Sequence, residues 1–349
     1  LAVVHNGIIE NHEQMRVRLS AAGYRFVSDT DTEVVAHLIH WHLKSGGDLF
    51  QAVRSSVAEL EGAYAIAVLS EKATARMVVA RKGAPLLLGL GKDENFAASD
   101  ASALLQVTRH MVYLEEGDVA EVGPDRCRIV DAAGREVERT VHESRLSADA
   151  VELGPYRHYM QKEIFEQPGA VANTLEMVVG AQSIVPQLFG VEAEVVLGQV
   201  SAVTVLACGT SYHAGLVARY WLEAIAGIPC SVEIASEYRY RDSVPDANAL
   251  IITISQSGET ADTIAALQHA KSLGQSLSLA ICNVPESALI RQAALRFLTR
   301  AGPEIGVAST KAFTTQLAAL FLLTLVLAKV RGRLSPEQER LHLHALRHL

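Results

Sequence analysis

The sequence predicts an α/β protein of two parts. The rear part should be a doubly wound, mostly parallel sheet, because short apolar runs alternate with helical stretches from about residue 194 onward. The front part should hold antiparallel sheets with helices packed outside, because its helices are grouped early and its hairpin-like strands come later. A length of 349 residues is also typical of two domains.

In the front part, three helices are expected, at residues 11–22, 34–44 and 48–60. Gly23 ends the first of them, and the stretch Thr30-Asp31-Thr32-Glu33 resembles a capping box before the second. The remaining elements are short strands and one short helical turn. The strands are expected at residues 1–4, 64–69, 77–80, 86–90, 95–98, 112–114, 119–122 and 127–130, and the turn at 101–106.

In the rear part, strands and helices alternate. Strands are expected at residues 203–207, 230–234, 249–254, 277–282 and 295–299, and helices at 212–226, 261–273 and 311–330. A charged and polar stretch without a strong period separates the two parts. We place the domains at residues 1–143 and 194–334, with 144–193 as a connection that includes leading helices and 335–349 as the start of a linker.

Composition excludes several classes of function. Charged residues make up 20% of the chain, the net charge is −8, and no basic stripe suggests a nucleic-acid partner. None of the four cysteines lies in a Cys-x-x-Cys pair, which argues against a zinc site and favours reduced thiols in the cytoplasm. The longest apolar run, 317–330, is shorter than the roughly 18 to 20 residues of a membrane span. We therefore expect no membrane association.

Hydroxyl-rich loops are the strongest functional signal. Residues 255–260 read Ser-Gln-Ser-Gly-Glu-Thr between an apolar strand and an amphipathic helix, where unpaired N–H groups attract an anion. Similar loops occur at 208–211 and 306–310, and all three should lie at one edge of the parallel sheet. Ordinary helix capping needs only one hydroxyl, so we interpret the loops as a phosphate site. A nicotinamide site is the alternative, but the Gly-x-Gly-x-x-Gly pattern is absent.

Two features of the front part permit two interpretations each. Asn6-Gly7 is the commonest hairpin turn pair, and from the residues alone a turn is the safer interpretation; the alternative is an oxyanion hole. Asp31 either complements the dipole of the helix it starts or holds a substrate ammonium group.

His37, His40 and His42 share a helix but lack the i, i+4 spacing of a zinc helix, so we assign them to packing or to the surface.

Six motifs together resemble the glucosamine-6-phosphate synthase family, the isomerizing glutamine–fructose-6-phosphate aminotransferases. They are VVHNGIIENH at 3–12, TDTEV at 30–34, YRHYMQKEI at 156–164, ACGTS at 207–211, SQSGET at 255–260 and GVASTK at 306–311. The resemblance implies a class II glutamine amidotransferase domain with the four-layer αββα fold of N-terminal nucleophile enzymes. It also implies that this domain is followed by a doubly wound SIS (sugar isomerase) domain.

The resemblance also implies roles for individual residues. Asn6 and Gly7 match the oxyanion hole, and Asp31 matches the carboxylate that binds the amino group of glutamine. The positions that match sugar-phosphate contacts or line the same pocket are Cys208, Gly209, Thr210, Ser211, Ser255, Gln256, Ser257, Thr260, Val307 and Ser309. The implied substrates are L-glutamine and fructose 6-phosphate, and the implied assembly is a homodimer through SIS domains. The resemblance implies no metal and no organic cofactor.

The chain departs from the family pattern at both ends. It starts at Leu1, inside an expected strand, without the N-terminal Cys nucleophile, and it lacks the second SIS domain with the isomerase residues. We therefore expect an internal fragment of an enzyme that converts fructose 6-phosphate to glucosamine 6-phosphate with glutamate as by-product, inactive by itself. The alternative is a non-enzymatic SIS regulator that binds a sugar phosphate, although such a regulator needs no glutaminase.

Overall fold

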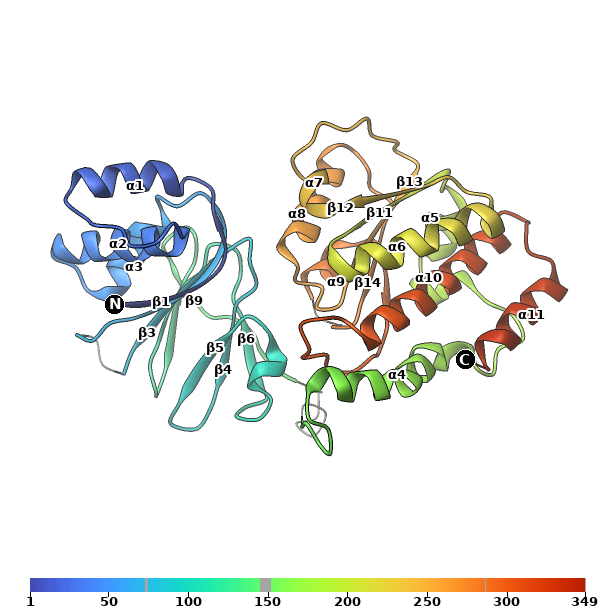
Figure 1. The fold of residues 1–349 in the computed structure, drawn as a ribbon, viewed down its shortest axis with the longest axis horizontal. Helices are drawn as coiled ribbons and strands as arrows, with labels where there is room; N and C mark the ends of the chain where they lie inside the picture. Colours follow the sequence, from blue (N-terminus) through green and yellow to red (C-terminus); the bar gives the residue numbers. More distant parts are fainter. Residues whose placement is uncertain (73–74, 145–151, 286, 349) are drawn as a thin grey trace. The chain divides into compact units, whose positions relative to one another are not determined.

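The structure, a computed structural model, describes residues 1–72, 75–144, 152–285 and 287–348. The chain divides into two compact units, Leu1–Asp149 and Ala150–Leu349 (Figure 1). Each unit has its own hydrophobic core. We refer to them as the front unit and the rear unit.

The front unit consists of helices and two antiparallel sheets. Its elements are β1 (Ala2–Ile9), α1 (His12–Ala21), α2 (Asp31–Lys44), α3 (Leu49–Val57), β2 (Gly62–Leu69), β3 (Met77–Lys82), β4 (Leu87–Leu90), β5 (Asn95–Ala98), the 3-10 helix η1 (Ala101–Leu104), β6 (His110–Tyr113), β7 (Val119–Val122), β8 (Cys127–Val130), β9 (Glu136–Val137) and β10 (Val141–Glu143). One sheet has the strand order β1-β2-β3-β7-β8-β9 and the other β10-β6-β4-β5.

The alternation of side chains along β2 explains the layers of the front unit. Ile66 and Val68 pack into one core with helix residues such as Leu38. Ala65, on the opposite face of the strand, packs into a second core with Leu88 of the other sheet. The larger sheet therefore lies between α1–α3 and the smaller sheet. In the described part of this unit, η1 is the only helical segment besides these three helices.

The rear unit is a doubly wound α/β fold. Its elements are α4 (Tyr159–Leu175), η3 (Glu176–Val178), η4 (Pro186–Phe189), α5 (Ala193–Gly198), β11 (Ala202–Ala207), α6 (Gly209–Trp221), the π-helical turn η5 (Leu222–Ala226), β12 (Cys230–Ile234), α7 (Ala235–Tyr238), β13 (Ala249–Ser255), α8 (Ala261–Ser272), β14 (Ser278–Cys282), α9 (Ala288–Gln292), β15 (Leu295–Leu298), α10 (Lys311–Val330) and α11 (Pro336–Leu346).

The five strands of the rear unit form one parallel sheet, as the sequence predicts, and their order is β12-β11-β13-β14-β15. Both faces of this sheet are covered. Ile252 and Ile254 of β13 pack into one core with α6 and α10, while Ile251, on the opposite face of the strand, packs into a second core with α7, α8 and α9. Continuous apolar strands such as β13 are typical of a sheet buried on both faces.

Two segments contribute more to the rear unit than their local pattern indicates. The polar stretch around residue 160, expected within a connection that includes leading helices, forms α4, whose buried residues include Ala170 and Leu175. The segment expected to begin a linker forms α11, and its Leu343 and Leu346 pack into the core of the rear unit. In both segments, tertiary contacts to the rear unit supply the stability that the local pattern does not indicate.

One helix of the described chain, α10, is long and apolar enough to cross a membrane by length and composition, and 67% of its most apolar window is buried inside the unit. Its buried residues include Leu320, Leu323 and Val326, which belong to the core beneath the sheet.

Candidate functional site

The loops after β11 and β13 leave the sheet side by side. The two strands are hydrogen-bonded neighbours, and Ala207 pairs with Ile254 at their carboxyl ends. Cys208 and Thr260, the N-caps of the following helices α6 and α8, make no side-chain cap hydrogen bond. The first N–H groups of both helices therefore receive no cap from these two side chains, at the edge of the sheet where α/β proteins bind ligands.

The hydroxyls of the loop after β13 already form some hydrogen bonds within the loop itself. Ser255 Oγ accepts a hydrogen bond from the Gly258 N–H at 3.0 Å and lies 2.9 Å from Thr260 Oγ1. Ser257 Oγ accepts from the Glu259 N–H at 3.1 Å. Because a hydroxyl that accepts still has its proton to donate, Ser257 keeps one donor and the Ser255–Thr260 pair keeps one between them. These donors suit an anion.

The loop before α10 is bound differently. Glu304 accepts hydrogen bonds from the Thr310 N–H at 2.9 Å and the Ala312 N–H at 3.0 Å, so a carboxylate of the chain itself occupies the start of α10. Ser309 Oγ donates to the same carboxylate at 2.8 Å. The Val307 side chain is fully exposed. The third predicted loop therefore does not present free helix N–H groups as the other two do.

The remaining predicted residues of the rear unit lie at the start of α6. Gly209 has a positive φ of 54°, and Thr210 and Ser211 follow it in the first turn, both half-buried. Gln256 contributes its backbone carbonyl to the Asn283 N–H at 3.1 Å. The structure thus places the predicted residues of the first two loops on neighbouring strand ends, and those of the third on a separately anchored loop.

In the front unit, Asn6 and Gly7 lie inside β1 and pair with Ala65 and Tyr64 of β2. The prediction of a turn, which the local sequence favours, is therefore wrong, because pairing with a strand more distant in the sequence overrides the local preference. Gly7 has a φ of +122°, and a Cβ atom there would lie 2.0 Å from the Ala63 carbonyl oxygen. This position requires glycine.

Asp31 contacts β1 on either side of Asn6 and Gly7. Its Oδ2 accepts from the Ile9 N–H at 2.9 Å, and its Oδ1 lies 3.7 Å from His5 Nδ1. The His5 ring is buried and its Nδ1 lies 3.0 Å from Thr32 Oγ1. Burial lowers the pKa of His5, although the charge of Asp31 opposes the shift. The three residues predicted for a glutamine site therefore lie on two elements in direct contact.

The expected capping box at the start of α2 is half formed. Thr30 accepts from the Glu33 N–H at 3.4 Å, as predicted. The Glu33 carboxylate, however, binds the preceding loop, through the Ser28 hydroxyl at 2.6 Å and the Val27 N–H at 2.9 Å. These hydrogen bonds, with that of the Ser28 hydroxyl the largest contribution, lower the pKa of Glu33 to about 2.

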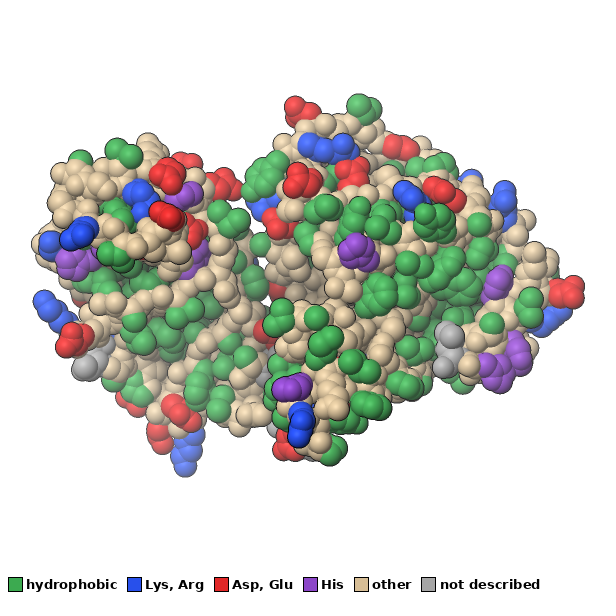
Figure 2. Space-filling model, in the orientation of Figure 1, with side chains coloured by type: hydrophobic (Ala, Val, Ile, Leu, Met, Phe, Trp, Pro, Cys, Tyr) green, Lys and Arg blue, Asp and Glu red, His purple; other side chains and the backbone are tan. Residues whose placement is uncertain are grey.

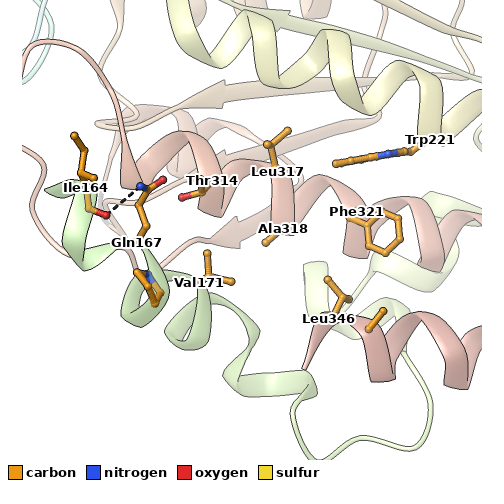
Figure 3. A pocket seen from close by; sticks show the side chains of 11 residues that line it. Ile164, Gln167, Val171, Trp221, Thr314, Leu317, Ala318, Phe321 and Leu346 are labelled. Carbon is orange, nitrogen blue, oxygen red and sulfur yellow. Dashed lines mark hydrogen bonds between the residues drawn. The ribbon is translucent and has the colours of Figure 1, made fainter. Parts of the chain in front are cut away.

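An apolar groove of about 620 Å³ lies between α4, α6, α10 and α11 (Figure 3). Its lining includes Ile164, Val171, Leu317 and the edge-to-face pair Trp221 and Phe321. Figure 2 shows hydrophobic side chains gathered on the visible face of the rear unit. The groove has no charged lining residue among those described and therefore does not suit a phosphate.

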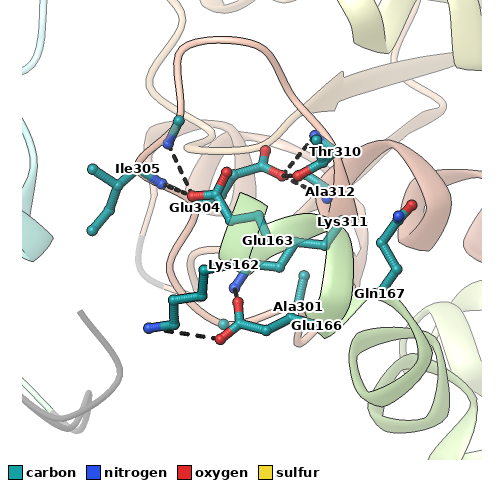
Figure 4. A network of polar contacts seen from close by, with 12 residues as sticks. Lys162, Glu163, Glu166, Gln167, Ala301, Glu304, Ile305, Thr310, Lys311 and Ala312 are labelled. Atoms are coloured by element: carbon teal, nitrogen blue, oxygen red, sulfur yellow. Dashed lines mark hydrogen bonds and ion pairs between the residues drawn. The ribbon is translucent and has the colours of Figure 1, made fainter. Parts of the chain in front are cut away.

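Sequence reasoning missed the polar network behind the third loop. Glu163 and Glu166 of α4 bind the loop and the start of α10, as Figure 4 shows. The partners lie more than a hundred residues apart in the chain, and no local pattern indicates such a pairing. Among the described residues, no cluster of His, Cys, Asp and Glu could hold a metal ion.

Comparison with known proteins identifies both units. Residues 1–106 match the family described as glutamine amidotransferase domain, and residues 197–326 match the family described as SIS domain. The chain therefore contains an amidotransferase domain followed by an SIS domain.

Curated relatives resemble the chain over its whole length. The chain is 60% identical over all 349 residues to the isomerizing glutamine–fructose-6-phosphate aminotransferase of Bordetella parapertussis, and 58% identical to that of Xanthomonas campestris pv. campestris. It spans 56% and 57% of their lengths, about half of each relative. The chain is thus a homologue, over its entire length, of these aminotransferases, which confirms the resemblance in its motifs.

A solved structure supports the fold of the rear unit. The C-terminal domain of glucosamine-fructose-6-phosphate aminotransferase from Francisella tularensis is 48% identical to the chain, covers 56% of it and 54% of its own length, and superposes with a TM-score of 0.54.

Proposed function

We propose that the chain supplies the glutamine-binding domain and a sugar-phosphate-binding domain of an enzyme that transfers the amide nitrogen of glutamine to fructose 6-phosphate. The products of the whole protein would be glucosamine 6-phosphate and glutamate. The observation that carries this proposal is the 60% identity to an aminotransferase of that name across both units. The proposal needs no metal and no organic cofactor.

In the rear unit, we assign the phosphate of the sugar to the starts of α6 and α8. The uncapped N–H groups of both helices, the spare proton of Ser257 and that of the Ser255–Thr260 pair belong to the segments that follow two neighbouring strand ends. Helix starts and hydroxyl donors favour a dianion. Thr210, Ser211 and the backbone around Cys208 and Gly209 would complete the site from the α6 side. Gln256, Val307 and Ser309 would line it.

In the front unit, we assign the amino group of glutamine to Asp31 and the developing oxyanion to the Asn6 amide and the Gly7 N–H. A carboxylate binds an ammonium group through charge-assisted hydrogen bonds. Two donors aimed at one oxygen stabilise a tetrahedral intermediate. The contacts of Asp31 with β1 on both sides of Asn6 and Gly7 support this assignment.

Ligand binding tests the two assignments separately. Fructose 6-phosphate at 100 times its dissociation constant should add about 2.7 kcal/mol to the free energy of unfolding of the rear unit, whereas fructose should add nothing. Ser257→Ala should weaken this binding, while Ser272→Ala, at the exposed end of α8, should not. Stabilisation by NAD but not by hexose phosphates would refute the assignment.

For glutamine, the test is Asp31→Asn, which keeps an acceptor for the Ile9 N–H but removes the charge that the ammonium group needs. We expect the variant to lose L-glutamine binding in calorimetry, whereas Asp29→Asn, a near neighbour in the sequence, should bind normally. Equal affinity for L-glutamine in the native chain and in Asp31→Asn would refute the assignment of Asp31.

We also propose that the protein works in the cytoplasm as a homodimer through its rear unit. All four cysteines are free thiols, as expected in a reducing compartment. The exposed apolar side chains of α4 and α6, including Met160, Phe165 and Tyr220, would suit a subunit interface. A sedimentation mass equal to that of one chain at micromolar concentration would refute the dimer.

A further inference from the structure

The carboxyl group of Glu163 is buried and binds backbone that is distant in the sequence. Glu163 lies on α4 and is 2% exposed. Its Oε1 accepts hydrogen bonds from the Ile305 N–H at 2.6 Å and from the Gly306 N–H at 2.9 Å (Figure 4). Both donors belong to the loop that carries Val307 and Ser309. A single side-chain oxygen therefore fixes two consecutive peptide groups of this loop.

Gly306 allows this close approach. A Cβ atom at residue 306 would lie 2.5 Å from Glu163 Oε2 and 3.5 Å from the Met160 Cα. Any side chain there would push the loop away from α4. The glycine and the carboxylate thus form one complementary contact, in which the loop backbone lies directly on the helix.

Two further carboxylates hold the end of the same loop. The Lys311 ammonium, 3% exposed, donates to Glu166 Oε2 at 2.7 Å, one turn along α4 from Glu163. Glu304 binds the start of α10 through the Thr310 and Ala312 N–H groups. The loop is therefore anchored to α4 at residues 305 and 306 and again at residue 311. Between these anchors, Val307 is exposed and Ser309 binds only the nearby Glu304 among the hydrogen bonds described.

We propose that Glu163 is a positioning residue for the sugar-phosphate site, an inference that rests on the proposed function of the rear unit. Through the Ile305 and Gly306 N–H groups, Glu163 holds the loop so that the Val307 backbone and the segment that carries Ser309 are placed before the ligand arrives. A loop ordered in advance loses less conformational entropy on binding, which increases affinity. Glu163 itself does not touch the ligand.

Three substitutions test separately the acceptor oxygen, its negative charge and the length of the side chain. Glu163→Gln keeps an acceptor oxygen for both N–H groups. Its NH₂ takes the position of Oε2, which has no hydrogen-bond partner among the described residues. Glu163→Asp keeps the charge but is one methylene too short. Glu163→Ala removes the acceptor. The matched control is Glu176→Gln, which breaks an exposed ion pair to Arg300 in the turn that follows α4.

The readouts are amide hydrogen exchange at Ile305 and Gly306 and the affinity for fructose 6-phosphate, with fructose as the non-phosphorylated probe. Loss of a hydrogen-bonded charged acceptor should accelerate exchange at both amides and weaken sugar-phosphate binding by about tenfold or more in the Ala and Asp variants. The Gln variant should remain within about threefold of the native chain, and the Glu176 control should be unchanged.

The two hypotheses fail in different ways. If the native chain does not bind fructose 6-phosphate, the proposed function is wrong. If the native chain binds it and Glu163→Ala binds it equally well, or if exchange at Ile305 and Gly306 is unaltered, the positioning role is wrong and the proposed function stands. A Gln variant as weak as the Ala variant would also overturn the role, because it would show that charge and not the acceptor matters.

Discussion

Replacement of Gly7 by alanine should destabilise the front unit more than any other change of one methyl group that we consider. The φ of +122° is sparsely populated by residues with a side chain and costs of order 1–3 kcal/mol for alanine. In addition, the new Cβ would lie 2.0 Å from the Ala63 carbonyl oxygen, so β1 must move away from β2. Such overpacking typically costs a further ~1–3 kcal/mol.

The matched control is Gly23→Ala in the same unit. Gly23 also has a positive φ, +90°, but no atom lies within 4 Å of the position that its Cβ would take, so only the conformational cost of ~1–2 kcal/mol applies. With ~2–4 °C of melting temperature per kcal/mol for a domain of this size, Gly7→Ala should melt at least ~4 °C below the native chain. The difference in melting temperature between the two variants measures the cost of the steric clash with Ala63.

Tryptophan fluorescence can report the front unit by itself. The chain contains two tryptophans, Trp41 in α2 and Trp221 in α6. In a Trp221→Phe background, the thermal transition of the fluorescence belongs to Trp41 and hence to the front unit. Equal melting temperatures for Gly7→Ala and Gly23→Ala would refute the reasoning, because the clash with Ala63 would then have no energetic consequence.

Further predictions concern charge, thiols and a second glycine. The low pKa of Glu33, about 2 against an ordinary value of 4.5, means that the stability contributed by its carboxylate is present above about pH 4.5 and is lost as pH falls toward 2; Glu33→Gln should therefore lower the unfolding midpoint at pH 6 but not at pH 2. Burial raises the pKa of three thiols, to about 11 for Cys127 and about 12 for Cys230 and Cys282. Iodoacetamide at pH 8 should label these three slowly by mass spectrometry, and rapid labelling in the folded chain would contradict their burial. Gly258→Ala places a Cβ 2.1 Å from Ser287 Oγ at a positive φ, so it should weaken binding of fructose 6-phosphate, whereas Gly274→Ala, with open space around it, should not.

The sequence was most informative where one segment determines its own structure. The apolar run of β13, the abrupt change to hydroxyls at Ser255 and the amphipathic helix α8 are all local features, and the structure contains them within one or two residues of the predicted bounds. The parallel arrangement of the rear strands follows from the same alternation of strand and helix. Local pattern and tertiary structure agree from β13 to α8.

The predictions were wrong where distant partners determine the conformation. Asn6-Gly7 has the composition of a turn, but β1 extends through it to Ile9 because β2 supplies backbone partners more than fifty residues later. Glu33 has the spacing of a capping box, but its carboxylate finds three donors in the preceding loop at Val27 and Ser28. In each case, the local preference is worth about 1 kcal/mol or less, which a few tertiary hydrogen bonds exceed.

The three hydroxyl loops illustrate the limit of reasoning from composition. They look equivalent in the sequence, yet their hydrogen bonds distinguish them. Ser257 accepts a hydrogen bond from a backbone N–H and can still donate one, whereas the hydroxyl of Ser309 already donates its hydrogen bond to Glu304. For Ser309 to donate to a phosphate, its hydroxyl must first leave that carboxylate, and the negative charge of Glu304 must tolerate a dianion nearby.

The first two loops should therefore dominate the affinity for the phosphate group. Ser257→Ala should cost more binding than Ser309→Ala, since only the former removes a donor that is free in the unliganded chain. Glu304→Gln separates the alternatives. If Ser309 leaves Glu304 to bind the phosphate, removal of the competing carboxylate charge should tighten the binding of fructose 6-phosphate. If Glu304 serves only to order the start of α10, the substitution should weaken binding, because a neutral amide is a poorer cap for the helix dipole than a carboxylate.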